Sequence, residues 1–150
     1  MRVDVKVEGL EELKKELERM SEQKKVEIKS EVYASALDIQ LQAKDNLLAL
    51  GAWDTGNLAG TIKADRTDGD MSAEIGPEAP YGPHIEFGTK PHFPPPDALE
   101  SWARHHGFDS AWPICKIIAK RGIKARPYLL PAFLAIEREF FNRIKEILAR

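Results

Sequence analysis

The chain has only one cysteine, Cys115, among its 150 residues. A single cysteine excludes an intrachain disulfide, so the fold must depend on a hydrophobic core. A chain of this length buries roughly 70% of its unfolded surface, and we expect a single domain over residues 1–150. Cys115 lies within the apolar stretch Trp112–Ile118. This setting favours a buried, inert thiol over a catalytic nucleophile.

The sequence also lacks a long hydrophobic run. Its longest apolar stretch, Tyr128–Ile136, has nine residues and contains Pro131, which is too short to span a bilayer. The beginning of the chain, MRVDVKVEGLEELKK, lacks the apolar segment of a signal peptide. We therefore expect a soluble protein that is made in the cytoplasm and has no membrane partner.

Basic residues are scarce in the middle of the chain. Residues 51–100 carry three basic and nine acidic side chains, whereas residues 101–150 carry ten basic and four acidic ones. The net charge of the whole chain is only −2. The chain as a whole therefore lacks the excess positive charge that would attract nucleic acid. The asymmetry indicates a polarised surface and a charged partner.

Complete sets of catalytic or metal-binding residues are missing as well. His84 and Glu86, within YGPHIEFGTKPH, have the H-x-E spacing of zinc deaminases, but those enzymes also need a P-C-x-x-C motif. Cys115 has no second cysteine three positions later. The chain contains no H-E-x-x-H, no G-x-S-x-G, no phosphate-binding glycine loop and no dinucleotide fingerprint. We expect no catalytic residue, no cofactor and no metal.

The hydrophobic periodicity predicts an α+β fold. Residues 2–8 alternate, with Val3, Val5 and Val7 on one face, and are expected to form a short strand. Apolar residues at helical spacing predict a small antiparallel β-sheet packed against a long N-terminal helix and a C-terminal helix. The expected helices are residues 10–20, 21–50, 99–106, 110–121 and a last helix that starts near Pro131. Asp97 and Glu100 have the spacing of a capping box.

A β-hairpin is predicted together with its register. Asp68-Gly69 is a strong signal for a two-residue turn. One register around this turn gives both an apolar face and a cross-strand ion pair. The predicted pairs are Ile62 with Ile75, Ala64 with Ala73, Arg66 with Met71, and Lys63 with Glu74.

The segment 116–126 carries five basic side chains and no acidic one. It could be a solvated helix end, where the helix dipole favours cations. It could equally be a surface that faces nucleic acid or an acidic neighbour, and the sequence leaves both interpretations open. The five residues are Lys116, Lys120, Arg121, Lys124 and Arg126.

Several short motifs follow one another along the chain. They are Asp54-Thr55-Gly56-Asn57-Leu58, Pro80-Tyr81, Glu86-Phe87-Gly88-Thr89, Pro91–Pro95, Leu99–Trp102, the basic glycine segment 119–125, Arg126-Pro127-Tyr128 and Pro131-Ala132-Phe133. In this order and spacing the chain resembles the tail-completion or neck proteins of long-tailed bacteriophages, often labelled minor tail components. It departs from them at Trp53 and Thr61, where a small apolar residue and a serine are common.

The resemblance implies a structural virion protein and not an enzyme. Such proteins form a ring in the virion neck that joins the DNA-filled head to the tail. The implied partners are other head–tail connector and tail proteins, further copies in a homo-oligomeric ring, six-fold by the resemblance, and passing DNA contacted through charge. The protein would be made in the bacterial host cytoplasm and end in the virion neck or tail.

The motif residues are, by the same resemblance, candidates for a structural or interface role. They are Asp54, Thr55, Gly56, Leu58, Tyr81, Glu86, Phe87, Gly88, Thr89, Pro127 and Pro131. Glu86 is expected to hydrogen-bond either backbone or a basic partner. Two other functions stay open: a sequence-independent DNA-binding module and a nucleic-acid-processing metalloenzyme of a phage.

Overall fold

The computed structural model describes residues 10–51, 57–67, 69 and 71–150. Its elements are α1 (Leu10–Arg19), α2 (Glu22–Ala49), α3 (Asn57–Thr61), β1 (Ile62–Thr67), β2 (Ser72–Pro77), α4 (Gly82–Phe87), the 3-10 turn η2 (Pro96–Ala98), α5 (Glu100–His105), α6 (Trp112–Arg121) and α7 (Leu129–Ala149). The predicted α+β class, with two long helices and a small antiparallel sheet, is confirmed. The strand predicted at residues 2–8 lies outside the described residues.

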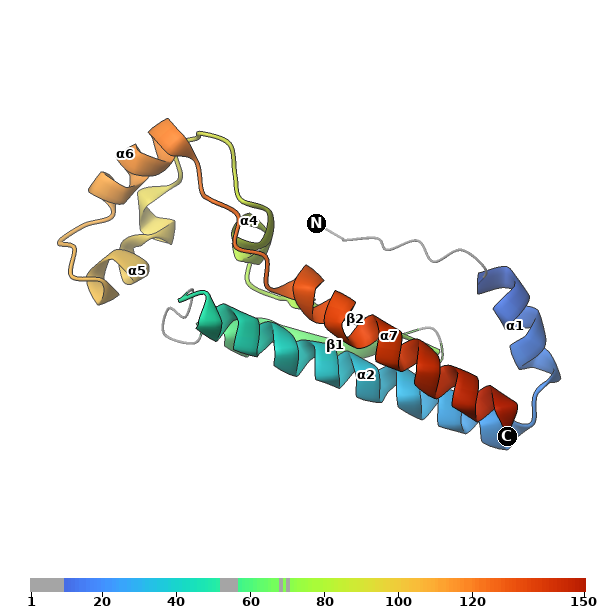
Figure 1. Cartoon of the computed structure of the whole chain (residues 1–150). Coiled ribbons are helices and arrows are strands. Elements are labelled where there is room, and N and C mark those ends of the chain that lie inside the picture. Colours follow the sequence, from blue (N-terminus) through green and yellow to red (C-terminus); the bar gives the residue numbers. More distant parts are fainter. Residues whose placement is uncertain (1–9, 52–56, 68, 70) are drawn as a thin grey trace.

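The long helices α2 and α7 lie side by side and form the body of the molecule (Figure 1). Ser21 caps the start of α2, because its side chain accepts a hydrogen bond from the Lys24 N–H at 3.4 Å. The helix ends before Gly51, which has a φ of 62°, the left-handed conformation that glycine favours. Leu50, the apolar residue that follows α2, is 40% exposed. It is the C-cap of the helix and lies beyond its last turn.

The core lies where α2, α7, α3 and the hairpin meet. Tyr128, Leu47 and Ile62 are the largest fully buried side chains of this core. Phe133 and Ile136 of α7 pack against this cluster but remain partly buried. The predicted stripes of α2 and α7 therefore supply the apolar faces that join the helices to each other and to the sheet.

The predicted hairpin exists, but its predicted register is wrong by two residues. Ala64 pairs with Ile75 and Lys63 with Gly76, so the connection is a four-residue loop, residues 68–71, and not the two-residue turn. A shift of two preserves the inward and outward faces of both strands. Lys63 consequently forms its ion pair with Glu78, at 2.8 Å, in place of the predicted pair with Glu74.

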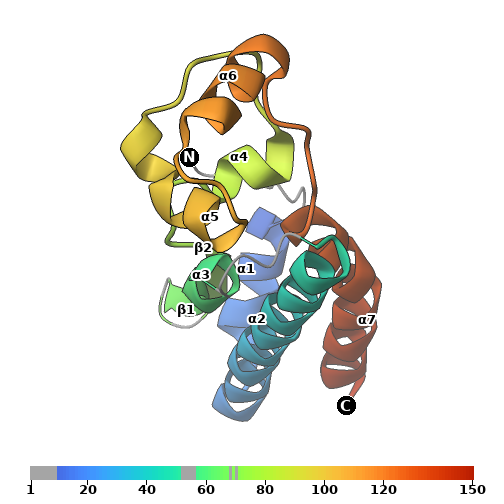
Figure 2. The same cartoon turned by 90° about the vertical axis from the view of Figure 1, so that its left-hand side faces the viewer.

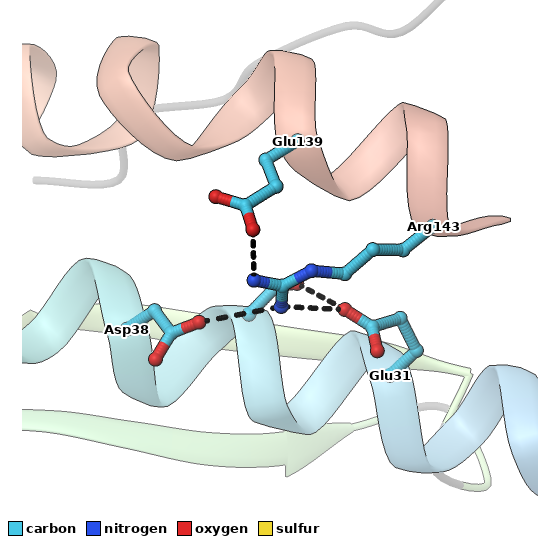
Figure 3. Close-up of polar contacts among 5 residues, drawn as sticks. Glu31, Asp38, Glu139 and Arg143 are labelled. Atoms are coloured by element: carbon cyan, nitrogen blue, oxygen red, sulfur yellow. Dashed lines mark hydrogen bonds and ion pairs between the residues drawn. The ribbon is translucent and has the colours of Figure 1, made fainter.

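Four polar side chains tie α7 to α2. The Arg143 guanidinium of α7 contacts Glu31 and Asp38 of α2, at 3.0 and 3.5 Å, and also Glu139 one turn earlier on α7 (Figure 3). The hydrogen bond to Glu139, and to a smaller extent the one to Glu31, raises the pKa of Arg143 above its ordinary value. The guanidinium therefore stays charged while it bridges the two helices.

Helices α5 and α6 form a separate lobe at one end of the body (Figures 1 and 2). The lobe has a small core of its own, built from Ala103, Ala111 and Cys115. Cys115 is fully buried, as predicted. Two chain segments connect the lobe to the body, one leaving after α4 and the other returning to α7 (Figure 1).

The predicted capping box at Asp97 and Glu100 is wrong. Asp97 lies in the 3-10 turn η2, and α5 begins only at Glu100, without a side-chain cap. The Glu100 carboxylate instead accepts a hydrogen bond from the backbone N–H of Ala111, at 3.1 Å. Ala111 is the N-cap residue of α6, so Glu100 connects the two helices of the lobe.

Candidate functional site

The joint between the lobe and the body is built around the buried carboxylate of Glu86, which is 5% exposed. One of its oxygens accepts hydrogen bonds from the N–H groups of Tyr128 and Leu129, both at 2.8 Å. The other accepts from the N–H group of Leu130 at 2.9 Å. These groups belong to the start of α7, where helix geometry leaves the N–H groups without intrahelical partners.

Pro131 completes this arrangement. It is the third residue of α7, and proline has no backbone N–H. Glu86 therefore satisfies every N–H group that the first turn leaves unpaired. Its negative charge also lies at the positive end of the helix dipole. The backbone alternative predicted for Glu86 is the one that the structure shows.

Tyr128 fills the space beneath this cap. Its hydroxyl donates to the carbonyl oxygen of Gly82 at 3.3 Å, and its own carbonyl oxygen accepts from the Asn46 side chain at 2.9 Å. Burial raises the pKa of Tyr128 above its ordinary value, and the charge of Glu86 raises it further. A Cβ at Gly82 would collide with Pro77, so the first residue of α4 must be glycine here.

Two glycines allow the outgoing and returning segments of the lobe to touch. Gly88 and Gly122 both have positive φ, 68° and 70°. Between them, the Thr89 N–H donates to the Ile123 carbonyl at 2.9 Å, and the Ile123 N–H donates back at 3.2 Å. A Cβ at Gly88 would lie 2.6 Å from the Ile123 oxygen. The motif Glu86-Phe87-Gly88-Thr89 therefore supplies one of the two backbone segments that cross here.

Other motif residues surround this joint. Leu58 of α3 is buried in the main core. Asn57 donates from its side chain to the Tyr81 hydroxyl at 2.7 Å, which brings the first two motifs together. Phe87, Pro127 and Pro131 are exposed. Asp54, Thr55 and Gly56 lie outside the described residues.

The basic segment, residues 116–126, lies on α6 and on the returning segment. All five of its basic side chains, Lys116, Lys120, Arg121, Lys124 and Arg126, are exposed. None of them forms an ion pair with another described residue. Trp112 and Phe93, 54% and 50% exposed, pack against each other beside α6 with ring centroids 5.6 Å apart.

The hairpin carries the opposite charge on its exposed face. Asp65 and Glu74 pair directly across the strands, and both side chains are exposed. We call these two residues the acidic hairpin pair. It belongs to the loop half of the hairpin, which runs along the body away from the lobe (Figure 1).

The histidines of the motif region do not gather around an ion. The rings of His84 and His92 lie 6.5 Å apart, and His92 Nδ1 is 2.9 Å from the carbonyl oxygen of Lys90. Across the described ranges, no group of three or more histidine, cysteine, aspartate or glutamate side chains is placed to hold a metal. Nor does any described helix combine the length and apolar character needed to cross a membrane.

Two residues of the joint, Asn46 and Gly122, could not be recognised from the sequence. Asn46 lies within α2, where no local pattern distinguishes it. Gly122 follows α6, and its local pattern indicates only that the helix ends there. Their partners, Tyr128 and Thr89, are distant in sequence. A long-range contact of this kind leaves no local periodicity to detect.

A comparison with protein families gives one match. A family model described as "Bacteriophage HK97-gp10, putative tail-component" (HK97-gp10_like) matches residues 11–88. The matched region runs from α1 through α4 and ends at Gly88, at the crossing. No curated protein and no solved structure matches the chain.

Proposed function

Because the chain belongs to the HK97-gp10-like family of bacteriophage tail components, we propose that it is a structural subunit of a ring in the virion neck that joins the head to the tail. Membership of this family supports a structural role in the phage tail. The ring and its position in the neck are our proposal. Its partners would be copies of itself and the head–tail connector and tail proteins on either side.

One observation carries this proposal: two oppositely charged surfaces lie on different parts of one subunit. The basic segment lies on the lobe and its returning connection, whereas the acidic hairpin pair lies on the body. A ring is closed by heterologous contacts, in which one face of a subunit meets a different face of its neighbour. Opposite charges on two such faces would steer the encounter and set the register.

The motif residues also support a structural role. Glu86, Gly88 and Tyr128 build the joint that holds the lobe, and they are occupied by backbone contacts. Their contacts thus lie within the fold of the subunit. We propose that the family motif preserves the angle at which the lobe leaves the body, since two chain segments and one capped helix start define that joint.

Removal of the protein from an infection tests the proposal. Phage grown without it should yield DNA-filled heads and finished tails that remain separate, which electron microscopy can count. Expression of the wild-type chain in the host should restore joined particles. Joined particles in normal numbers without the protein would contradict a joining role, and a failure to form tails would place its action in tail assembly.

A sequence-independent DNA-binding module is the second candidate, because the exposed basic side chains lack described acidic partners. Binding of this kind depends steeply on salt, since each phosphate contact releases counterions. Titration of the purified protein with duplex DNA at several salt concentrations distinguishes the candidates. The neck proposal expects weak binding, whereas tight binding with a steep salt slope would favour the DNA module.

A further inference from the structure

The two-stranded sheet has one outer edge covered and one open. Glu78 donates its N–H to the Thr61 carbonyl at 3.0 Å, next to the last pair of the ladder. In an antiparallel ladder, residues that hydrogen-bond the partner strand alternate with residues whose backbone groups point outward. The backbone groups of Ala73 and Ile75 therefore point away from β1. On the other side, the Gln40 side chain donates to the Ile62 carbonyl at 2.8 Å and covers part of the β1 edge. No described residue hydrogen-bonds the outward groups of Ala73 and Ile75.

An apolar groove lies beside this open edge. It has a volume of about 170 Å³ and runs between β2, α2 and α7. Ala73 and Ile75 form one wall, and the phenylalanines of α7 form the other. The aromatic residues of that wall, Phe133, Phe140 and Phe141, are partly buried or exposed. An isolated two-stranded hairpin is marginal in water, and an open edge beside apolar side chains invites another strand.

We propose that residues 2–8 of the same chain add to β2 as a third strand and place Val3, Val5 and Val7 over this groove. These residues lie outside the described part of the chain, and their alternation is the reason for the proposal. Because successive side chains of a strand point to opposite faces, the valines would meet the phenylalanine wall. Arg2, Asp4, Lys6 and Glu8 would then face solvent.

The lengths of the elements suit a segment of the same chain. Helix α1 turns back from the start of α2 (Figure 1). Its ten residues are about 15 Å long. This length matches the distance of about 16 Å along α2 from Ser21 to Val32, which lines the groove. A strand over residues 2–8 would be about 23 Å long, comparable with about 20 Å for the six residues of β2. A tethered segment also has a much higher effective concentration than one from another molecule.

Amide hydrogen exchange of the full-length protein tests the third strand directly. The Ala73 and Ile75 amides should be protected in the wild type. Substitution of Val3, Val5 and Val7 together by serine should abolish this protection and lower the Tm by about 4 °C or more. Substitution of Asp4 and Lys6 by serine, on the opposite face, is the matched control and should leave both values near wild type.

Three results would overturn the inference. Rapid exchange of Ala73 and Ile75 in the wild type, or equal protection in the valine variant, would show that residues 2–8 do not cover the edge. Protection that disappears on dilution of the protein would show that a second copy supplies the strand. Protection that is independent of concentration supports the same-chain arrangement. The inference does not rest on the proposed function, because each of these results can be obtained whether or not the protein joins heads to tails.

Discussion

At the scale of single residues, Glu86 shows why local patterns reveal a residue but not its role. The sequence marks Glu86 through the H-x-E spacing and through the glutamate-phenylalanine-glycine-threonine motif. Its three hydrogen bonds go to N–H groups 42 to 44 positions later in the chain. No spacing rule connects positions so far apart, so the cap of α7 could not be predicted from the sequence. From the sequence, Glu86 could only be expected to hydrogen-bond either backbone or a basic side chain.

Substitution of Glu86 by glutamine should destabilise the protein by about 1–3 kcal/mol. The amide keeps one acceptor oxygen but turns an N–H donor toward backbone N–H groups. Urea unfolding measures the loss. Glu146→Gln, at an exposed position of the same helix α7, is the control and should cost less than about 0.5 kcal/mol. Equal stability of the two variants would contradict the capping role.

Substitution of Gly88 by alanine should cost at least about 2 kcal/mol, because a side chain is disfavoured at positive φ and its Cβ would also meet the Ile123 oxygen. Gly107→Ala separates the two causes. Gly107 also has positive φ, 79°, but a Cβ there meets nothing within 4 Å. It should lose only about 1 kcal/mol. The difference in urea midpoint between the variants measures the close approach at the crossing, and no difference would refute it.

At the scale of elements, the hairpin shows what the sequence could and could not determine. The alternation of Ile62 and Ala64 correctly identified the buried face. This face depends only on whether a residue lies an even or an odd number of positions along the strand. The register depends on loop length, and a two-residue and a four-residue loop give the same faces. The Asp68-Gly69 signal favoured the shorter loop. The ion pair of Lys63 with Glu78 and the contact between the Thr67 and Ser72 hydroxyls, at 2.6 Å, accompany the longer one.

The pair of long helices gives an element-scale prediction. The Arg143 guanidinium contacts the carboxylates of Glu31, Asp38 and Glu139 (Figure 3). Arg143→Gln leaves these carboxylates close together, so their repulsion should lower stability at low salt. Added NaCl screens such repulsion. The free energy of unfolding of this variant should therefore rise with salt relative to the wild type. Arg138→Gln, an exposed position on the same helix, is the control and should show no such relative rise. A salt response equal to that of the control would contradict the bridging role.

At the scale of the whole molecule, charge is arranged by the joint between lobe and body. The sequence showed an acidic middle and a basic last third, but it could not show where these regions lie in space. That arrangement depends on the cap by Glu86 and on the crossing at Gly88 and Gly122. A single exposed ion pair contributes only about 0.2–1 kcal/mol, so several charges would have to act together at each contact of the proposed ring.

We propose that the basic segment of one subunit meets the acidic hairpin pair of the next, and charge reversal in infected cells tests this contact. Lys120→Glu, Arg121→Glu and Lys124→Glu combined should leave the subunit folded but greatly reduce the number of neck-bearing particles counted by electron microscopy. Addition of Asp65→Lys and Glu74→Lys should partly restore that number, because opposite charges would face each other again. The matched control reverses the exposed residues Lys15, Arg138 and Lys145 and should assemble normally. Normal neck occupancy in the first triple variant would contradict the account, and normal assembly with impaired DNA retention would show that the basic segment faces DNA.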